Sequence, residues 1–208
     1  MSAPDARARA LRLAVLGDSI GWGQGASRPE DRLAARLVAG LADHGIESDA
    51  EVVAVPGARS TALAGQVRRA QPARPDVAVI VIGANDLTHR TPPRDAAADL
   101  GAAVRALRSA GARVVVAPAP DLSSVPHVPA AMRPAVRRAS EELRALQVAA
   151  VEAEGGLVAD ADHRTSRAFA EDPTLFSADR FHPSSRGYAV IAASLLPAVL
   201  EALRTDSA

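Results

Sequence analysis

The sequence predicts an α/β fold with three layers, in which a parallel β-sheet is covered by helices on both faces. Short apolar runs alternate along the chain with amphipathic segments of helical spacing. The apolar runs lack the polar alternation of half-exposed strands, which indicates burial on both faces. Polar residues directly follow several of these runs, where an open parallel sheet binds its ligands.

Five apolar runs are the expected strands, and the run at 77–82 is the clearest and is expected to be central. They are Leu11–Gly17, Glu51–Pro56, Asp76–Gly83, Ala112–Ala117 and Gly156–Ala159. Apolar residues at helical spacing predict helices around 33–41 and 100–107, a longer helix after Pro134, and a last one over 185–203. The proline-rich stretch 118–133 is expected to be an ordered loop that borders a substrate site.

Length and composition predict one domain. A chain of 208 residues with 48% hydrophobic content can bury one sizeable core. We expect this domain to span 11–204, with a disordered or loosely packed tail at 1–10 and a C-terminal tail at 205–208.

Charge and cysteine content exclude several classes of partner. The 24 basic and 24 acidic residues cancel, so no net field attracts nucleic acid or an anionic membrane. Without cysteine there is no disulfide framework and no thiolate metal site. The first apolar run is too short for a signal peptide, and Pro197 and Glu201 interrupt the C-terminal apolar segment. We therefore expect a cytoplasmic protein without membrane insertion that acts on a small molecule.

Two polar segments far apart in the chain predict nucleophilic chemistry. Gly17-Asp18-Ser19 follows the first strand directly, and Asp179 and His182 stand three residues apart near the C-terminus. A serine hydroxyl is a poor nucleophile at neutral pH and needs a positioned imidazole to take its proton. This pairing predicts a serine hydrolase.

Gly57 and Asn85 follow the second and third expected strands, on the same edge of the sheet as Ser19. A backbone N–H and a side-chain amide at that edge could stabilise an oxyanion. Taken singly, both residue types are more often turn formers than oxyanion donors. Their occurrence together with the serine and histidine favours the oxyanion function.

The chain resembles the SGNH hydrolase superfamily, also called the GDSL esterases and lipases. The matching residues are Gly17-Asp18-Ser19, Gly57, Gly83-x-Asn85-Asp86 and Asp179-x-x-His182-Pro183. The resemblance implies a flavodoxin-like α/β/α fold with a five-stranded parallel sheet. It also implies Ser19 as nucleophile, His182 as base, Asp179 as the residue that orients it, and an oxyanion hole from Ser19 N–H, Gly57 N–H and the Asn85 side chain. One departure is Val55-Pro56 before Gly57, where family members often carry a small polar residue.

We expect a carboxylic ester hydrolase that works through an acyl-serine intermediate, with no cofactor and no metal. The low aromatic content of 2% favours short acyl chains on a small-molecule, lipid or carbohydrate ester. An acyltransferase or a thioesterase would use the same residues, so both remain alternatives. A non-catalytic ligand-binding domain is the third alternative, and the intact set of polar residues argues against it.

Four further residues are candidates for lining the substrate site: Asp18, Trp22, Arg59 and His89. Trp22 could equally pack in the core under the first helix. Arg59 could be a solvated arginine, and His89 an ordinary loop residue. His44 and His127 are expected on the surface.

Other readings of the same residues are weaker. Gly17-x-Ser19-x-Gly21 fits the nucleophile turn of α/β-hydrolases, but several strands precede the serine in that fold. Gly21-x-Gly23-x-x-Ala26 fits a dinucleotide fingerprint, but no acidic residue ends the second strand to hold a ribose. His163, after Asp160-Ala161-Asp162, could belong to a rival dyad or metal site; helix capping by Asp162 or Thr165 fits better.

Overall fold

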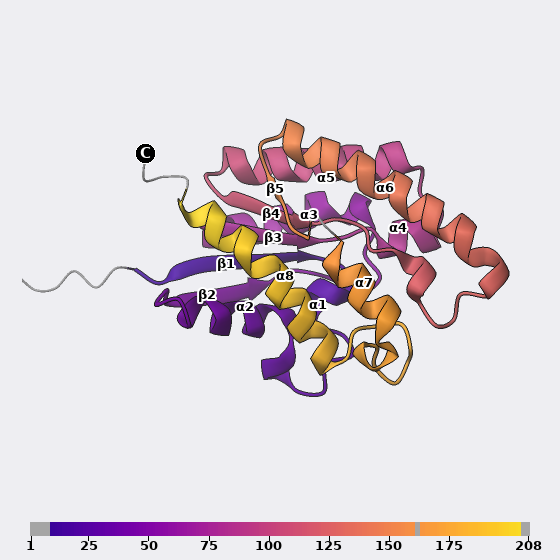
Figure 1. Cartoon of the computed structure of the whole chain (residues 1–208). Coiled ribbons are helices and arrows are strands. Elements are labelled where there is room, and N and C mark those ends of the chain that lie inside the picture. Colours follow the sequence, from indigo (N-terminus) through magenta and orange to yellow (C-terminus); the bar gives the residue numbers. More distant parts are fainter. Residues whose placement is uncertain (1–8, 161–162, 205–208) are drawn as a thin grey trace, which may run out of the picture.

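The computed structural model describes residues 9–160 and 163–204. Within these residues, five parallel strands form one sheet in the order β2-β1-β3-β4-β5 (Figure 1). The strands are β1 (Leu11–Gly17), β2 (Ser48–Val52), β3 (Val77–Val81), β4 (Arg113–Ala117) and β5 (Leu157–Val158). The predicted α/β fold class and flavodoxin-like strand order are confirmed, and β3 lies at the centre as expected.

Helices cover both faces of the sheet, as Figure 1 shows. Alternate residues of β1 and β3 point to opposite faces, so Val15 and Val79 pack with one helical layer while Leu16 and Ile80 pack with the other. The first layer contains α2 (Leu33–Ala42), α7 (Arg164–Glu171) and α8 (Ser185–Arg204); the second contains α3 (Leu63–Ala70), α5 (Pro93–Ser109) and α6 (Arg133–Ala153). Two short helices, α1 (Ser19–Trp22) and α4 (Ala84–Thr88), follow β1 and β3.

The second strand differs from its prediction, which placed it at Glu51–Pro56. β2 begins at Ser48 and ends at Val52, and its middle residues Asp49 to Glu51 are exposed. It lies at the edge of the sheet, where polar side chains are tolerated, so the search for a run buried on both faces missed its first half. Val53 still donates a backbone hydrogen bond to β1, but beyond Val52 the chain leaves the ladder.

The last helix is more apolar than the sequence argument allowed. Among the residues that the structure describes, α8 is long and apolar enough to cross a membrane by length and composition, despite Pro197 and Glu201. Its residues Tyr188, Leu195 and Val199 are nonetheless buried against the sheet and α2. The composition of α8 is therefore explained by its position in the core.

The expected tails fall mostly outside the described residues, since 1–8 and 205–208 are not among them. Arg9, placed in the N-terminal tail by the sequence, forms an ion pair with Asp76 at 2.7 Å. The chain is thus in contact with the sheet from residue 9 onward. The division into one domain and two tails remains a prediction.

Candidate functional site

The turn after β1 is shaped by a glycine that no other residue could replace without rearrangement. Gly17 has φ +124°, and a Cβ there would lie 1.8 Å from the carbonyl oxygen of Val81 in β3. Both conditions demand glycine. Asp18 and Ser19 follow, and Ser19 begins α1 beside the end of β3. In this strand order the winding reverses between β1 and β3, so Ser19 lies at the switch point where ligands bind.

The structure brings Ser19, His182 and Asp179 into one hydrogen-bonded chain. The Nε2 atom of His182 is 3.0 Å from the Ser19 hydroxyl, and its Nδ1 atom is 2.6 Å from Asp179 Oδ2. A carboxylate can only accept, so Nδ1 carries the proton of a neutral imidazole. Nε2 is then the acceptor that faces the Ser19 hydroxyl, which is the arrangement of a general base.

The Asp179 carboxylate is held by donors on both oxygens. Oδ1 accepts hydrogen bonds from Ser177 Oγ, Phe181 N and His182 N, at 2.8 to 2.9 Å, while Oδ2 faces the imidazole. Partial burial tends to raise the pKa of Asp179, but these hydrogen bonds outweigh it and hold the pKa well below its usual value. Asp179 is therefore ionised at neutral pH.

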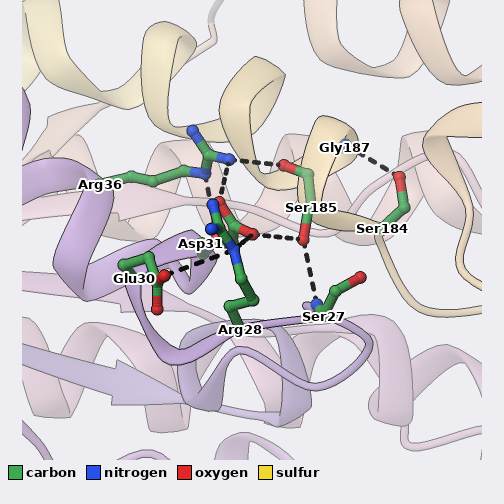
Figure 2. Close-up of polar contacts among 8 residues, drawn as sticks. All are labelled: Ser27, Arg28, Glu30, Asp31, Arg36, Ser184, Ser185 and Gly187. Carbon is green, nitrogen blue, oxygen red and sulfur yellow. Dashed lines mark hydrogen bonds and ion pairs between the residues drawn. The ribbon is translucent and has the colours of Figure 1, made fainter.

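The segment after His182 is fastened to the loop between α1 and α2, as Figure 2 shows. Ser185 donates its hydroxyl to Asp31 at 2.8 Å and accepts a hydrogen bond from the Ser27 N–H at 3.0 Å. Arg36 donates to both Asp31 and the Ser185 carbonyl. The contacts to Ser185 cross more than 140 residues of sequence and fix the start of α8, three residues beyond His182.

A second glycine lets the same loop approach His182. Gly25 has φ +93°, and a Cβ there would lie 2.4 Å from the Pro183 carbonyl and 3.1 Å from His182 Cβ. The buried Tyr188 hydroxyl donates to the adjacent Gln24 carbonyl at 2.8 Å. The backbone on both sides of the imidazole is thus restrained.

Gly57 and Asn85 are brought together by contacts between their loops. The Asn85 side-chain amide donates to the carbonyl of Ala58 at 3.1 Å, next to Gly57. Asp86 is completely buried and accepts hydrogen bonds from the Ser60 N–H and hydroxyl. Asp86 therefore ties the Gly57 loop to the start of α4, and the departure at Val55-Pro56 leaves this link in place.

An apolar pocket opens beside Ser19 and His182. We call it the inner pocket, and its volume is about 80 Å³. Its apolar walls come from α1, α7, α8 and the turn before His182: Ile20, Phe169, Phe176, Phe181 and Ile191. The loop between β4 and α6 also lines it, within the proline-rich stretch 118–133 that we expect to border a substrate site. Ser19 and His182 therefore lie at the wall of an apolar pocket.

Residues 15–190 match the model of the GDSL-like lipase/acylhydrolase family. The chain belongs to this family. The "GDSL-like esterase Rv1075c" of Mycobacterium tuberculosis is 36% identical over 197 residues, which cover 93% of this chain and 63% of that protein. The chain therefore spans less than two thirds of this relative.

Solved structures share the fold at lower identity. The psychrotrophic esterase EstA from Pseudoalteromonas sp. superposes with a TM-score of 0.73 at 18% identity, covering 92% of this chain and 98% of that one. Axe2, an acetylxylan esterase from Geobacillus stearothermophilus, gives 0.69 at 19% identity, with 91% and 94% covered. These likenesses agree with the GDSL-like fold that the sequence predicted.

The further candidate residues lie away from the inner pocket. Trp22 is 42% exposed, and the Arg32 guanidinium lies over the Trp22 ring at 5.4 Å from the ring centroid. The alternative that Trp22 packs in the core is therefore wrong. Arg59 is exposed at the start of a 3₁₀ turn. His89 is also exposed and contacts the Asn85 carbonyl through Nδ1 at 2.9 Å. Substrate contact by these three remains a prediction.

The alternative built on His163 receives no support from its neighbours. Within residues 9–160 and 163–204, no cluster of three or more potential metal ligands occurs. His163 precedes α7, and the Asp160 carboxylate accepts the Thr165 N–H at 3.2 Å. Asp160 thus performs the capping expected of Asp162 or Thr165; Asp162 itself lies outside the described residues.

Several supporting residues escaped the sequence interpretation. Gln66 of α3 is 1% exposed and exchanges two hydrogen bonds with the backbone of Gly17. His127, expected only on the surface, donates from Nε2 to the Asp179 carbonyl at 2.8 Å. Both contacts join residues about 50 positions apart. The only signal for the first was a glutamine among the apolar residues of 63–70, a segment for which the sequence predicts no helix.

Asp18 is a buried acid beside Ser19, with 1% exposure. Burial raises its pKa to about 7, the nearby charge of Asp86 adds to this, and a hydrogen bond from the Ile20 N–H opposes it. Ionising Asp18 in the folded protein therefore costs free energy.

Replacing Asp18 with asparagine is expected to remove a pH-dependent loss of stability. The folded carboxyl binds its proton more tightly than the unfolded one, so its contribution is full below about pH 4 and is lost as pH rises towards about 7. Asn keeps the acceptor for Ile20 N–H. In urea unfolding, the stability of Asp18→Asn relative to wild type should rise by on the order of a few kcal/mol between about pH 4 and pH 8. The exposed Asp49→Asn serves as control; equal pH dependence in all three proteins would contradict the assignment.

Proposed function

We propose that this GDSL-family chain hydrolyses carboxylic esters through an acyl-serine intermediate. The observation that carries the proposal is the hydrogen-bonded chain from Ser19 through His182 to Asp179, with distances of 3.0 and 2.6 Å. The family match and the name of the Mycobacterium tuberculosis relative support it.

In the first step the Ser19 oxygen attacks the ester carbonyl while His182 Nε2 takes its proton. The imidazolium is stabilised by ionised Asp179 at Nδ1, and it then protonates the departing alcohol oxygen. In the second step a water molecule attacks the acyl-serine carbonyl, and His182 takes the proton of water and returns it to Ser19. Atoms balance as ester plus water giving acid plus alcohol, and every proton passes through one imidazole nitrogen.

The negative charge of each tetrahedral intermediate is held by the Ser19 N–H, the Gly57 N–H and the Asn85 amide. Asn85 uses one amide hydrogen on the Ala58 carbonyl, which orients the group and leaves its second hydrogen for the oxyanion. Donors that are already oriented stabilise such charge at little reorganisation cost. The proposal includes a preference for esters with short acyl chains, which the low aromatic content of the sequence favours.

Labelling by a fluorophosphonate probe tests the proposed function. The protein should hydrolyse para-nitrophenyl butanoate, and the probe should abolish this activity as one phosphonyl group per chain becomes attached to Ser19. Peptide mass spectrometry locates the adduct, and heat-unfolded protein is the control that should not react. Hydrolysis that survives complete labelling, or an adduct at another residue, would refute the proposal.

A further inference from the structure

A second apolar pocket lies next to the inner pocket. We call it the outer pocket, and its volume is about 270 Å³. It lies between α4, the loop 122–132 and the start of α6, where Leu87, Val128, Met132 and Val136 line it. Met132 is 53% exposed, so the outer pocket adjoins the protein surface.

Three side chains separate the two pockets, because they line both: Leu122, Val125 and Phe181. We call these three residues the partition. Leu122 and Val125 are 9% and 5% exposed and pack in one apolar cluster with Phe181 and Phe176. The partition is therefore formed by packed apolar side chains that the two pockets share.

The loop that carries Leu122 and Val125 of the partition is fixed at several points. Asp121 accepts a hydrogen bond from the Ser123 N–H at 2.8 Å and pairs with Arg137 of α6 at 3.4 Å. Further along, His127 donates to the Asp179 carbonyl. These contacts hold Leu122 and Val125 in place relative to Ser19 and His182, so the wall limits what enters from the inner pocket.

We propose that the inner pocket binds the acyl chain of the substrate and that the partition sets its maximum length. The inference rests on the proposed ester hydrolysis. The acyl group stays attached to Ser19 until water attacks, whereas the alcohol leaves first and must have an open exit. An apolar pocket lined by all three phenylalanines of the chain suits the group that stays.

The volume of the inner pocket gives the length of the acyl chain that it can hold. An apolar cavity of about 150 Å³ accommodates benzene, so a cavity of about 80 Å³ takes about three carbon atoms. With the carbonyl carbon at Ser19, this corresponds to a butanoyl group. Longer chains meet Leu122 and Val125, although a larger apolar space lies directly behind them.

Removing the partition should extend the preferred acyl chain. In Val125→Ala the two pockets join, and each further buried methylene should raise kcat/KM about fourfold. We expect wild type to prefer para-nitrophenyl butanoate over hexanoate, and the ratio of hexanoate to butanoate to rise about 15-fold in Val125→Ala. Val128→Ala is the matched control: it makes the same change three residues away, lines only the outer pocket, and should keep the wild-type ratio within about threefold.

Two further variants keep the test decisive if Val125→Ala folds poorly, which thermal unfolding will reveal. Leu122→Ala opens the same wall and should shift the profile in the same direction, while Val125→Leu narrows the inner pocket and should favour acetate over butanoate.

An unchanged acyl-length profile in properly folded variants that still react with the fluorophosphonate would overturn the partition but leave the proposed function standing. A response to alcohol length alone would place the alcohol in the inner pocket and also overturn it. Absence of both hydrolysis and labelling in wild type would instead refute the proposed function.

Discussion

Replacing Ser19 with alanine is expected to lower kcat for ester hydrolysis on the order of 10⁶-fold and to abolish fluorophosphonate labelling. The substitution removes the Ser19 hydroxyl, whose oxygen lies 3.0 Å from His182 Nε2. Within residues 9–160 and 163–204, this oxygen is the only hydrogen-bond partner of Nε2. Stopped assays with para-nitrophenyl butanoate measure the rate. Residual hydrolysis above the water reaction would come from the oxyanion donors and the binding pocket.

The fold of this variant should survive, because alanine suits the first position of a helix and, among the described residues, the lost hydroxyl is hydrogen-bonded only to the imidazole. Circular dichroism and thermal unfolding check this point. Ser27→Ala is the matched control, since Ser27 is exposed in the loop after α1 and meets Ser185 through its backbone N–H. A Ser19→Ala protein that turns over ester within tenfold of wild type would exclude Ser19 as nucleophile.

The prediction of the fold succeeded where burial alone determines the pattern. β1 from residue 13 onward and the whole of β3 are buried in the sheet interior, and their apolar runs could be recognised without knowing their neighbours. The start of β2 escaped prediction because an edge strand is partly solvated, so its exposed Asp49 looks like a loop residue and the predicted strand begins only at Glu51. Edge position is a property of the assembled sheet, and no local pattern of residues reports it.

The residues of the candidate site were likewise predictable only in part. Ser19, Gly57 and Asn85 could be assigned to one edge of the sheet because each follows an expected strand, and parallel strands end at one edge. The residues that hold them could not: Gln66, Asp86 and Asp31 act through partners in other elements, and a polar side chain on a helix or turn is usually solvated. Likewise, three phenylalanines from separate segments form one pocket only after folding.

Trp22 shows the limit of reasoning from sequence distance. It lies three residues after Ser19, yet α1 turns its side chain towards Arg32 and the edge strand β2. Proximity along the chain therefore gave no guide to which aromatic residues line the pocket.

Replacing Asp179 with asparagine is the second change with a very large expected effect, about 10⁴-fold in kcat. The reason lies in the hydrogen bonds of the two carboxylate oxygens. Oδ1 accepts three donors, from Ser177, Phe181 and His182, so the asparagine must keep its carbonyl oxygen there. Its NH₂ group then faces His182 Nδ1, 2.6 Å away in the native protein, and a donor meets a donor.

The imidazole can relieve this clash by moving its proton to Nε2, which leaves Nδ1 as an acceptor for asparagine. Nε2 then presents an N–H to Ser19 and can no longer take the serine proton. We expect kcat to fall while KM changes little, because the inner pocket is untouched. Asp172→Asn is the matched control. Asp172 forms a similar turn with Thr174 and an ion pair with Arg186, and none of these contacts involves His182. A wrong tautomer of His182 must slow the chemical step and so lower kcat. If Asp179→Asn and Asp172→Asn both kept kcat within about tenfold of wild type, Asp179 would not orient the base.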